Sequence, residues 1–475
     1  MSIVRSLVSY APAVVLPRLV ALALVVVLTR LMPIGDYGLF TLVMAAGEAI
    51  DGIAANWLRI ALARFGGGRP ETLGAEAARC GRLSVLTFAI ALPAAGLAAL
   101  WLGRDRVGGF LLALVLYLAG VAVVRFAATL LAARGDRNGL FAVETGRAVG
   151  MLAAGIAAAV VLGGDYVAVS GLSSAVMMAV GLWGVKRALR GLHPTPASPE
   201  PTRAVLAYAL PMIPAAAIAA LLAYADRFAL DHVAGPAAVA LYAAAVVLAR
   251  QPMEFLFTVA NTRVFAQLME AWERDGPEIA GRRLGELMAG LALVTFPAAA
   301  GLALVAEPMA RLLLAPDYLD AALVVMPWAI AAALLSGFKL FVFDQVFHMV
   351  RASWTNALNA VPAGVLGILA LIVLVPRWGL EGAAAAAALQ YAVLLATTVA
   401  LTARRLPLSV PWNDLARIGA ATAIMAGALL LADPWVAHLA TALRLAALVG
   451  LGVVTYSAAV LVLRPTPVVD ILPRR

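Results

Sequence analysis

The stretch YALPMIPAAAIAALLAYADRFALDHVAGPAAVALYAAA, from Tyr208 to Ala245, contains two apolar runs separated by a short polar segment. A helix of about 20 apolar residues is long enough to cross the hydrocarbon core of a bilayer. Asp226 and Arg227 lie at the end of the first run, and Gly235 with Pro236 is a turn signal before the second. The stretch therefore predicts two membrane-spanning helices joined by a turn, with Asp226 and Arg227 near the outer interface.

Similar apolar runs recur along all 475 residues, of which 64% are hydrophobic and only 13% are charged. Soluble domains carry about 25% charged residues. The runs predict an all-α polytopic membrane protein with about 14 transmembrane helices. The single cysteine, Cys80, excludes an internal disulfide, and the four histidines lack the spacing of a metal site.

The 35 Lys and Arg residues fall mainly in short loops on one side of the predicted helices. Cytoplasmic loops of membrane proteins carry such an excess of basic residues. The net charge of +9 is therefore attributed to membrane topology and not to nucleic-acid binding. The pattern predicts a multi-pass membrane protein with both termini in the cytoplasm.

The predicted helices fall into repeated groups. Residues 1–186 hold six spans, residues 187–203 form a Pro-rich cytoplasmic linker, and residues 204–402 hold six more. Similar stretches such as YGLFTLVMAA and VALYAAAVVLA recur roughly 200 residues apart. A parallel repeat predicts two six-helix lobes around a central cavity. Residues 403–475 add helices 13 and 14 and a short tail.

Several of these segments resemble those of bacterial polysaccharide flippases. TRLMPIGDYGLFTLV (Thr29–Val43) is similar to the loop between their first two helices, Tyr208–Ala245 to their seventh and eighth helices, and LLLAPDYLDAALVVMP (Leu312–Pro327) to a later segment. The family lies within the multidrug/oligosaccharidyl-lipid/polysaccharide exporter superfamily. The resemblance implies alternating-access movement of undecaprenyl-diphosphate-linked oligosaccharide from the cytoplasmic to the periplasmic leaflet. The product would serve exopolysaccharide, O-antigen or a related surface polysaccharide, and the last two helices would help to accommodate the lipid tail.

Charged residues inside the predicted spans should face the protein interior, because exposure to lipid is costly. Arginine binds phosphate oxygens with two parallel hydrogen bonds, so intramembrane cations suit a diphosphate. Candidates for binding the diphosphate or sugar are Arg18, Arg59, Arg125, Arg147, Arg250 and Lys339. Candidates for ion coupling or charge balance are Glu48, Asp51 and Glu254, and Asp226 with Arg227 is an outer-gate or interfacial pair.

Each of these assignments has a structural alternative. Arg59, Arg125 and Lys339 suit snorkelling toward inner headgroups, and Arg250 with Glu254 has the i,i+4 spacing of a structural pair. Glu48 and Asp51 suit simple neutralisation of nearby arginines. Eleven residues, about three helical turns, would place Glu48 and Arg59 on one helix face.

Two other transport functions remain open. A cation-coupled multidrug or toxin extrusion antiporter would use Glu48, Asp51 or Glu254. A lipid II flippase would carry an arginine-rich first helix, a pattern absent from this sequence. The expected partners are membrane lipid, a proton or sodium ion, and the polymerase and export machinery for polysaccharide.

An enzymatic function has little support. A polymerase or glycosyltransferase would need a large extramembrane loop, and the longest one here lies near Val264–Arg283. The sequence contains no GxGxxG, Walker-type loop or nucleophile–base set. We therefore predict a transporter that is not an enzyme and needs no cofactor.

Overall fold

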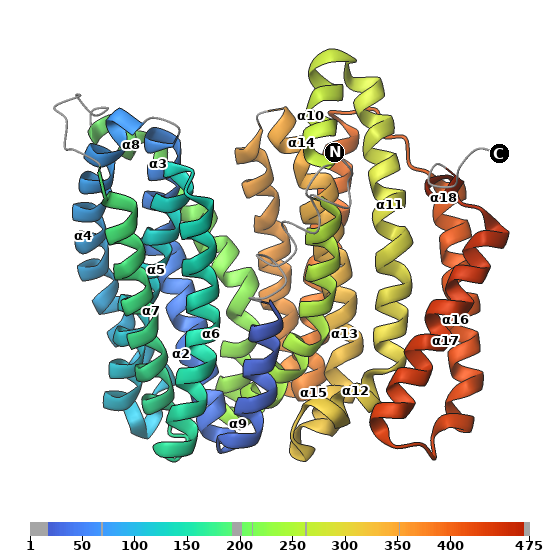
Figure 1. The fold of residues 1–475 in the computed structure, drawn as a ribbon, viewed down its shortest axis with the longest axis horizontal. Coiled ribbons are helices and arrows are strands. Elements are labelled where there is room, and N and C mark those ends of the chain that lie inside the picture. Colours follow the sequence, from blue (N-terminus) through green and yellow to red (C-terminus); the bar gives the residue numbers. More distant parts are fainter. Residues whose placement is uncertain are drawn as a thin grey trace. The chain divides into compact units, whose positions relative to one another are not determined.

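A computed structural model describes residues 18–67, 70–191, 202–210, 212–261, 264–350 and 352–469 (Figure 1). These residues are almost entirely helical, and no strand occurs among them. Eleven helices in this part of the chain are long and apolar enough to cross a membrane. Two of them, Thr202–Thr258 and Leu358–Ala403, contain a non-helical glycine, Gly235 and Gly379 respectively, at which two helices meet. The all-α polytopic fold is confirmed, while the count of 14 stays a prediction.

The described chain forms two compact units, Met1–Ala243 and Ala244–Arg475, whose boundary lies within helix α9. The first unit therefore includes the first arm of α9, which the sequence repeat assigned to the second lobe. The two units are defined by spatial compactness and the two lobes by sequence repetition. The predicted boundaries of the lobes therefore stay a prediction. Most of the predicted linker, residues 192–201, lies outside the described residues.

The first unit consists of a helix over residues 18–31 and the elements α2 (Ile34–Ala54), α3 (Asn56–Gly66), α4 (Pro70–Leu102), η1 (Arg104–Arg106), α5 (Val107–Arg134), α6 (Arg137–Val161), α7 (Tyr166–Leu189), α8 (Thr202–Ala209) and the first arm of α9 (Met212–Asn261). Helix α5 lies at its centre and packs against α2, α4, α6 and α7. Gly120 and Gly181 permit the close approach of α5 and α7, because a Cβ at Gly181 would lie 2.7 Å from the Val124 nitrogen.

The second unit consists of the rest of α9 and α10 (Val264–Arg274), α11 (Pro277–Leu304), α12 (Ala306–Leu313), η2 (Pro316–Tyr318), α13 (Leu319–Phe338), η3 (Lys339–Phe343), α14 (Asp344–Met349), α15 (Ser353–Ala403), α16 (Trp412–Val436), α17 (Thr441–Leu463) and α18 (Thr466–Val469). Helices α16 and α17 pair with each other and pack on α11, while α13 packs on α15. The element η3 is a π-helical turn between α13 and α14.

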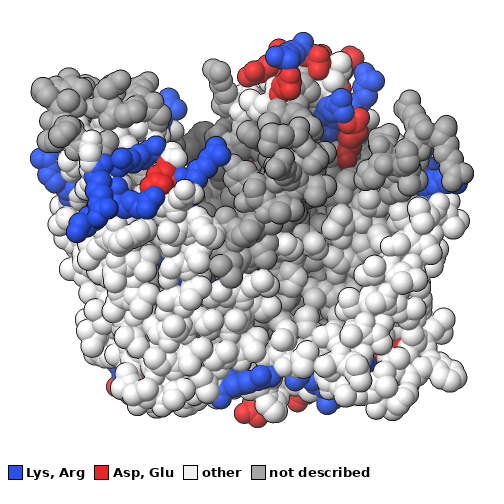
Figure 2. All heavy atoms as spheres, viewed as in Figure 1, with Lys and Arg blue, Asp and Glu red and all other residues white. Residues whose placement is uncertain are grey.

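The exposed flanks of the helices are largely apolar. On the face shown in Figure 2, Lys, Arg, Asp and Glu gather at the two ends and leave an uncharged band between them. Large apolar side chains such as Val85, Leu97 and Val462 are exposed on these flanks. A lipid-facing surface explains this exposure. Apolar side chains are stable in hydrocarbon, and a helix satisfies its own backbone hydrogen bonds there.

The loop between α5 and α6 is held by an ion pair with α7. Asp136 is the N-cap of α6, where its Oδ1 accepts a hydrogen bond from the Gly139 N–H. Arg187 Nε donates to Asp136 Oδ2 at 2.7 Å. Arg134 donates to carbonyls at the end of α7, including that of Ala188 at 2.6 Å. The hydrogen bond from Arg187, together with that from Gly139, holds the pKa of the Asp136 carboxyl below its usual value.

This lowered pKa makes the loop acid-sensitive. Because the folded-state pKa is the lower one, the stabilisation is present above the unfolded-state pKa, about 4, and is lost as the pH falls through the folded-state pKa. Asp136→Asn keeps a good N-cap but removes the charge, so we expect about threefold faster amide exchange in the first turn of α6 at neutral pH. Hydrogen-exchange mass spectrometry of both proteins measures this ratio. A ratio that persists in acid would contradict the role of the ion pair.

Candidate functional site

Four charged side chains of the first unit form one network. Arg59 on α3 donates from Nη1 to Asp51 Oδ1 at 2.9 Å and from Nη2 to Asp51 Oδ2 at 2.8 Å. Arg125 on α5 donates to Asp51 Oδ2 at 2.7 Å and to Glu48 Oε2 at 2.5 Å. Tyr117 O–H donates to Glu48 Oε1 at 2.8 Å. Two guanidinium groups and two carboxylates thus neutralise one another between α2, α3 and α5.

The break between α2 and α3 determines which residues meet in this network. Helix α2 ends at Ala54, and Ala55 has φ −121° and ψ −17° before α3 begins. Three regular turns therefore do not connect Glu48 with Arg59, and the prediction that the two share one helix face is wrong. Arg59 instead meets Asp51, whose side chain is only 2% exposed.

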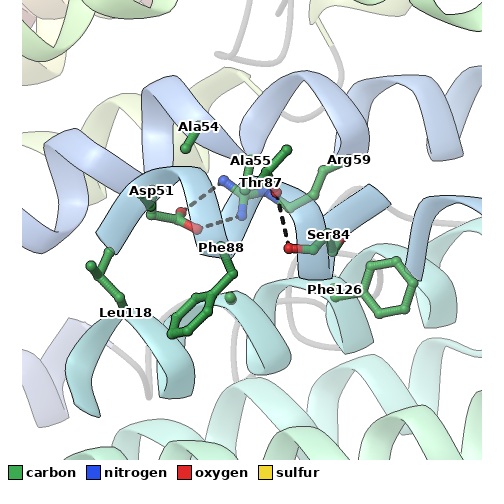
Figure 3. A pocket seen from close by; sticks show the side chains of 11 residues that line it. Asp51, Ala54, Ala55, Arg59, Ser84, Thr87, Phe88, Leu118 and Phe126 are labelled. Carbon is green, nitrogen blue, oxygen red and sulfur yellow. Dashed lines mark hydrogen bonds and ion pairs between the residues drawn. The ribbon is translucent and has the colours of Figure 1, made fainter. Parts of the chain in front are cut away.

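The cavity beside this network is small. Figure 3 shows the Asp51–Arg59 pair at its edge, together with Ser84 and Thr87 of α4. Its volume is about 30 Å³, enough for about one water molecule and far too small for a sugar. The hydrogen bonds from Arg59 and Arg125 favour the charge-balancing alternative for Glu48 and Asp51 over ion coupling.

The pair that ends the first apolar run lies within a helix and not at its end. Helix α9 continues past Asp226 and Arg227 for about two turns to Gly235, which has φ 80°. Tyr242 O–H, beyond that turn, donates to Asp226 Oδ2 at 2.6 Å. Arg227 Nη1 donates to the Ala223 carbonyl at 3.0 Å. Arg227 Nη1 also lies 3.7 Å from Asp226 Oδ1, so the two residues pair with each other as well as with separate neighbours. Asp226 connects the two arms of α9.

Two more of the predicted cations lie beside carboxylates. Arg147 pairs with Glu144 at 2.9 Å, and Arg250 pairs with Glu254 at 3.0 Å. These two pairs are about one-third exposed. Arg18 is the first described residue of the helix over residues 18–31 and is half-buried. An incoming anion must therefore compete with a protein carboxylate for most of the predicted cations.

Lys339 has a partner that the sequence analysis missed. Its Nζ lies 2.7 Å from Asp344 Oδ2, and the two side chains are 15% and 6% exposed. Side chains five residues apart do not meet on a regular α-helix, so helical spacing does not predict this pair. The π-turn of η3, in which the Asp344 N–H bonds the Lys339 carbonyl, brings them together.

A second missed contact joins η1 to α9 within the first unit. Arg104 adopts a left-handed φ of 47°. Its guanidinium donates to the Asp231 carbonyl and lies 3.4 Å from Asp231 Oδ1. Arg106 pairs with Asp36 at 2.8 Å. The charge-rich loop LGRDR was the available signal, but its partners are distant in sequence.

The second unit contains a large apolar groove of about 600 Å³. It is lined by α9, α11, α12, α16 and α17, and the lining includes Met253, Pro297, Met309, Met425, Leu448 and Gly452. The phenol of Tyr456, which also lines it, donates to the Leu293 carbonyl at 2.6 Å. The groove therefore presents an almost entirely apolar wall.

A family model described as polysaccharide biosynthesis protein matches residues 75–323, more than half of the chain. The chain belongs to this polysaccharide biosynthesis family. The membership confirms the resemblance predicted from the sequence. A search of curated proteins finds no match.

Solved structures of transporters share the fold of this family member. The chain is similar to the lipid II flippase MurJ in an inward closed conformation, with 11% identity, a TM-score of 0.74, and coverage of 95% of this chain and 98% of that chain. A multidrug resistance MATE family transporter in an inward-facing conformation gives 15% identity, a TM-score of 0.66, and coverage of 82% and 94%. A third structure is that of a MOP superfamily transporter from Pyrococcus furiosus. It gives 16% identity, a TM-score of 0.59, and coverage of 85% of this chain and 94% of that chain.

Proposed function

We propose that this protein is a flippase that moves undecaprenyl-diphosphate-linked oligosaccharide from the cytoplasmic to the periplasmic leaflet of a bacterial inner membrane. It would serve the synthesis of exopolysaccharide, O-antigen or a related surface polysaccharide, with both termini in the cytoplasm. The apolar groove of the second unit carries this proposal, since it suits a polyprenyl tail. Family membership and the shared transporter fold support it.

The chemistry of the groove favours a hydrocarbon chain. A drug-sized ligand is usually fixed by a few polar groups among apolar ones. Here the only hydroxyls among the described residues of the lining are that of Ser457 and that of Tyr456, which donates to the Leu293 carbonyl. A polyprenyl chain needs no polar partner, and each buried methylene contributes about 0.8 kcal/mol. This difference argues against the multidrug antiporter as the alternative function.

Arg250 is the cation best placed to meet the diphosphate of a lipid whose tail occupies this groove. Met253 and Pro252 of α9 line the groove, and Arg250 precedes Met253 by three residues, so the two share a helix face. The Arg250–Glu254 pair is 34% and 40% exposed, which leaves it accessible to an anion. A guanidinium can bind phosphate oxygens bidentately.

The direct test is a flipping assay in liposomes that contain the purified protein and a fluorescent undecaprenyl-diphosphate sugar. We expect protein-dependent flipping, and Arg250→Ala should reduce its rate about tenfold because a charged hydrogen bond contributes about 1.5–3 kcal/mol. Arg283→Ala is the matched control, because Arg283 forms an exposed pair with Glu286 on α11. Flipping no faster than in protein-free liposomes, with efflux of cationic dyes instead, would support the antiporter.

A further inference from the structure

In the Lys339–Asp344 pair only one of the two carboxylate oxygens of Asp344 has a hydrogen-bond partner among the described residues. Its Oδ2 accepts from Lys339 Nζ at 2.7 Å, while its buried Oδ1 has no hydrogen-bond partner. Asp51, which is also deeply buried, is by contrast held by two arginines through both oxygens. A buried carboxylate oxygen without a partner is costly, and such exceptions call for a functional explanation.

The surroundings of the pair are aromatic. Phe338 and Phe341 flank Lys339 in sequence, and both pack on the Phe257 ring with centroid distances of 5.6 Å. The pair lies within the candidate span Pro316–Met349. The π-turn that holds it is a feature that recurs at functional sites.

Other charged groups do not compensate Asp344 in the described structure. Helices α10, α11, α13 and α15 pack against η3 and α14, and Phe257, in the part of α9 that belongs to this unit, packs on Phe341 of η3. The ionisable residues of these segments, with those of α14 and the turn after α15, are Arg250, Glu254, Glu270, Glu273, Arg274, Glu278, Arg282, Arg283, Glu286, Asp320, His348, Arg377, Glu381, Tyr391, Arg404 and Arg405. Arg250 pairs with Glu254. Glu270 pairs with Arg274 and Glu286 with Arg283, while Arg405 lies over the Phe347 ring. Among the described residues, Lys339 is the cation that forms an ion pair with Asp344.

We propose that Asp344 is a proton-binding site, and that a proton and the ammonium group of Lys339 alternate as the partner of its carboxylate. When an anion draws Lys339 away, the buried carboxylate takes up one proton from water and becomes a neutral acid. When Lys339 returns, that proton is released, and the ammonium remains charged throughout. The identity of the anion rests on the proposed function, in which it is the lipid diphosphate. Binding of the diphosphate is thereby coupled to proton uptake by Asp344.

The physical reason is that Asp344 can hold its charge only while a cation is beside it. A carboxylate that loses its partner in a low-dielectric site is neutralised by protonation. Lysine suits such an exchange, because its ammonium is a single point charge on a flexible stem, whereas arginine holds a carboxylate with a rigid fork. The unpartnered Oδ1 is available to carry the proton.

Infrared difference spectroscopy tests this site in the purified full chain, because a protonated carboxyl gives a carbonyl-stretch band that a carboxylate lacks. Lys339→Met imitates withdrawal of the ammonium, and we expect this band at neutral pH without ligand. The double variant Lys339→Met/Asp344→Asn should lack the band. Lys186→Met, at the other lysine of the chain, is the matched control and should also lack it. Lys339→Gln provides a second variant with a polar side chain.

Ligand coupling is tested in the wild type with farnesyl diphosphate as a detergent-compatible probe. Binding should produce the same carbonyl band, and Asp344→Asn should bind the probe without producing it. Absence of the band in both Lys339 variants would overturn the proton site. Binding of the probe without the band would overturn the exchange. Absence of any binding would contradict the diphosphate part of the proposed function, while the Lys339 variants still decide the proton site.

Discussion

Asp51→Leu is expected to lower the free energy of unfolding by about 3–5 kcal/mol, the cost of removing one partner from a buried ion pair. The Asp51 side chain is 2% exposed and accepts three hydrogen bonds from Arg59 and Arg125. Leucine of similar volume leaves Arg59, itself 10% exposed, without its counter-charge. Thermal unfolding in detergent, followed by tryptophan fluorescence, measures the loss.

A second substitution separates a structural role of Asp51 from a role in ion coupling. In Asp51→Leu/Arg59→Met the remaining pair, Glu48 with Arg125, is neutral, so we expect recovery of more than half of the lost stability. Glu286→Gln, in an exposed pair, is the control and should change stability by less than about 1 kcal/mol. A double variant as unstable as the sum of its single variants would contradict charge balance. Recovered stability without recovered flipping would instead indicate ion coupling by Asp51.

The spans were predictable because helices in lipid must satisfy their own backbone and expose apolar side chains. The same logic identified Glu48, Asp51 and Arg125 as interior charges, and the structure brings them together. Their pairing was not predictable, because it depends on the helix break at Ala55 and on the packing of α5 against α2.

The contacts that the sequence did not predict lie where the backbone departs from the regular helix. Lys339 and Asp344 meet only because η3 is a π-turn, and helical spacing rules contain no such element. Arg104 reaches Asp231 from a left-handed conformation after α4 ends. The helical period of 3.6 residues predicts neither contact.

Gly452→Phe in the apolar groove is expected to weaken binding of an undecaprenyl-diphosphate sugar about 100-fold. A Cβ at Gly452 would meet the Leu429 and Met425 side chains at ordinary contact distances of 3.6–3.8 Å, so the first atoms of the new side chain fit. The ring would then occupy part of the groove that Gly452 lines. Displacing about four methylene groups of a bound tail costs roughly 3 kcal/mol, which corresponds to this factor.

Gly450→Phe on the same helix is the matched control. Gly450 is exposed, and a Cβ there would meet no atom within 4 Å, so the ring points away from the packed interior. Both substitutions add the same side chain to α17, and only Gly452 lines the groove. Titration of a fluorescent undecaprenyl carrier should therefore show weaker binding for Gly452→Phe alone. Gly452→Phe should weaken binding of a farnesyl carrier less than binding of the undecaprenyl carrier, because the shorter tail fills less of the groove. Equal losses for both variants or for both tails would mean that the tail binds elsewhere.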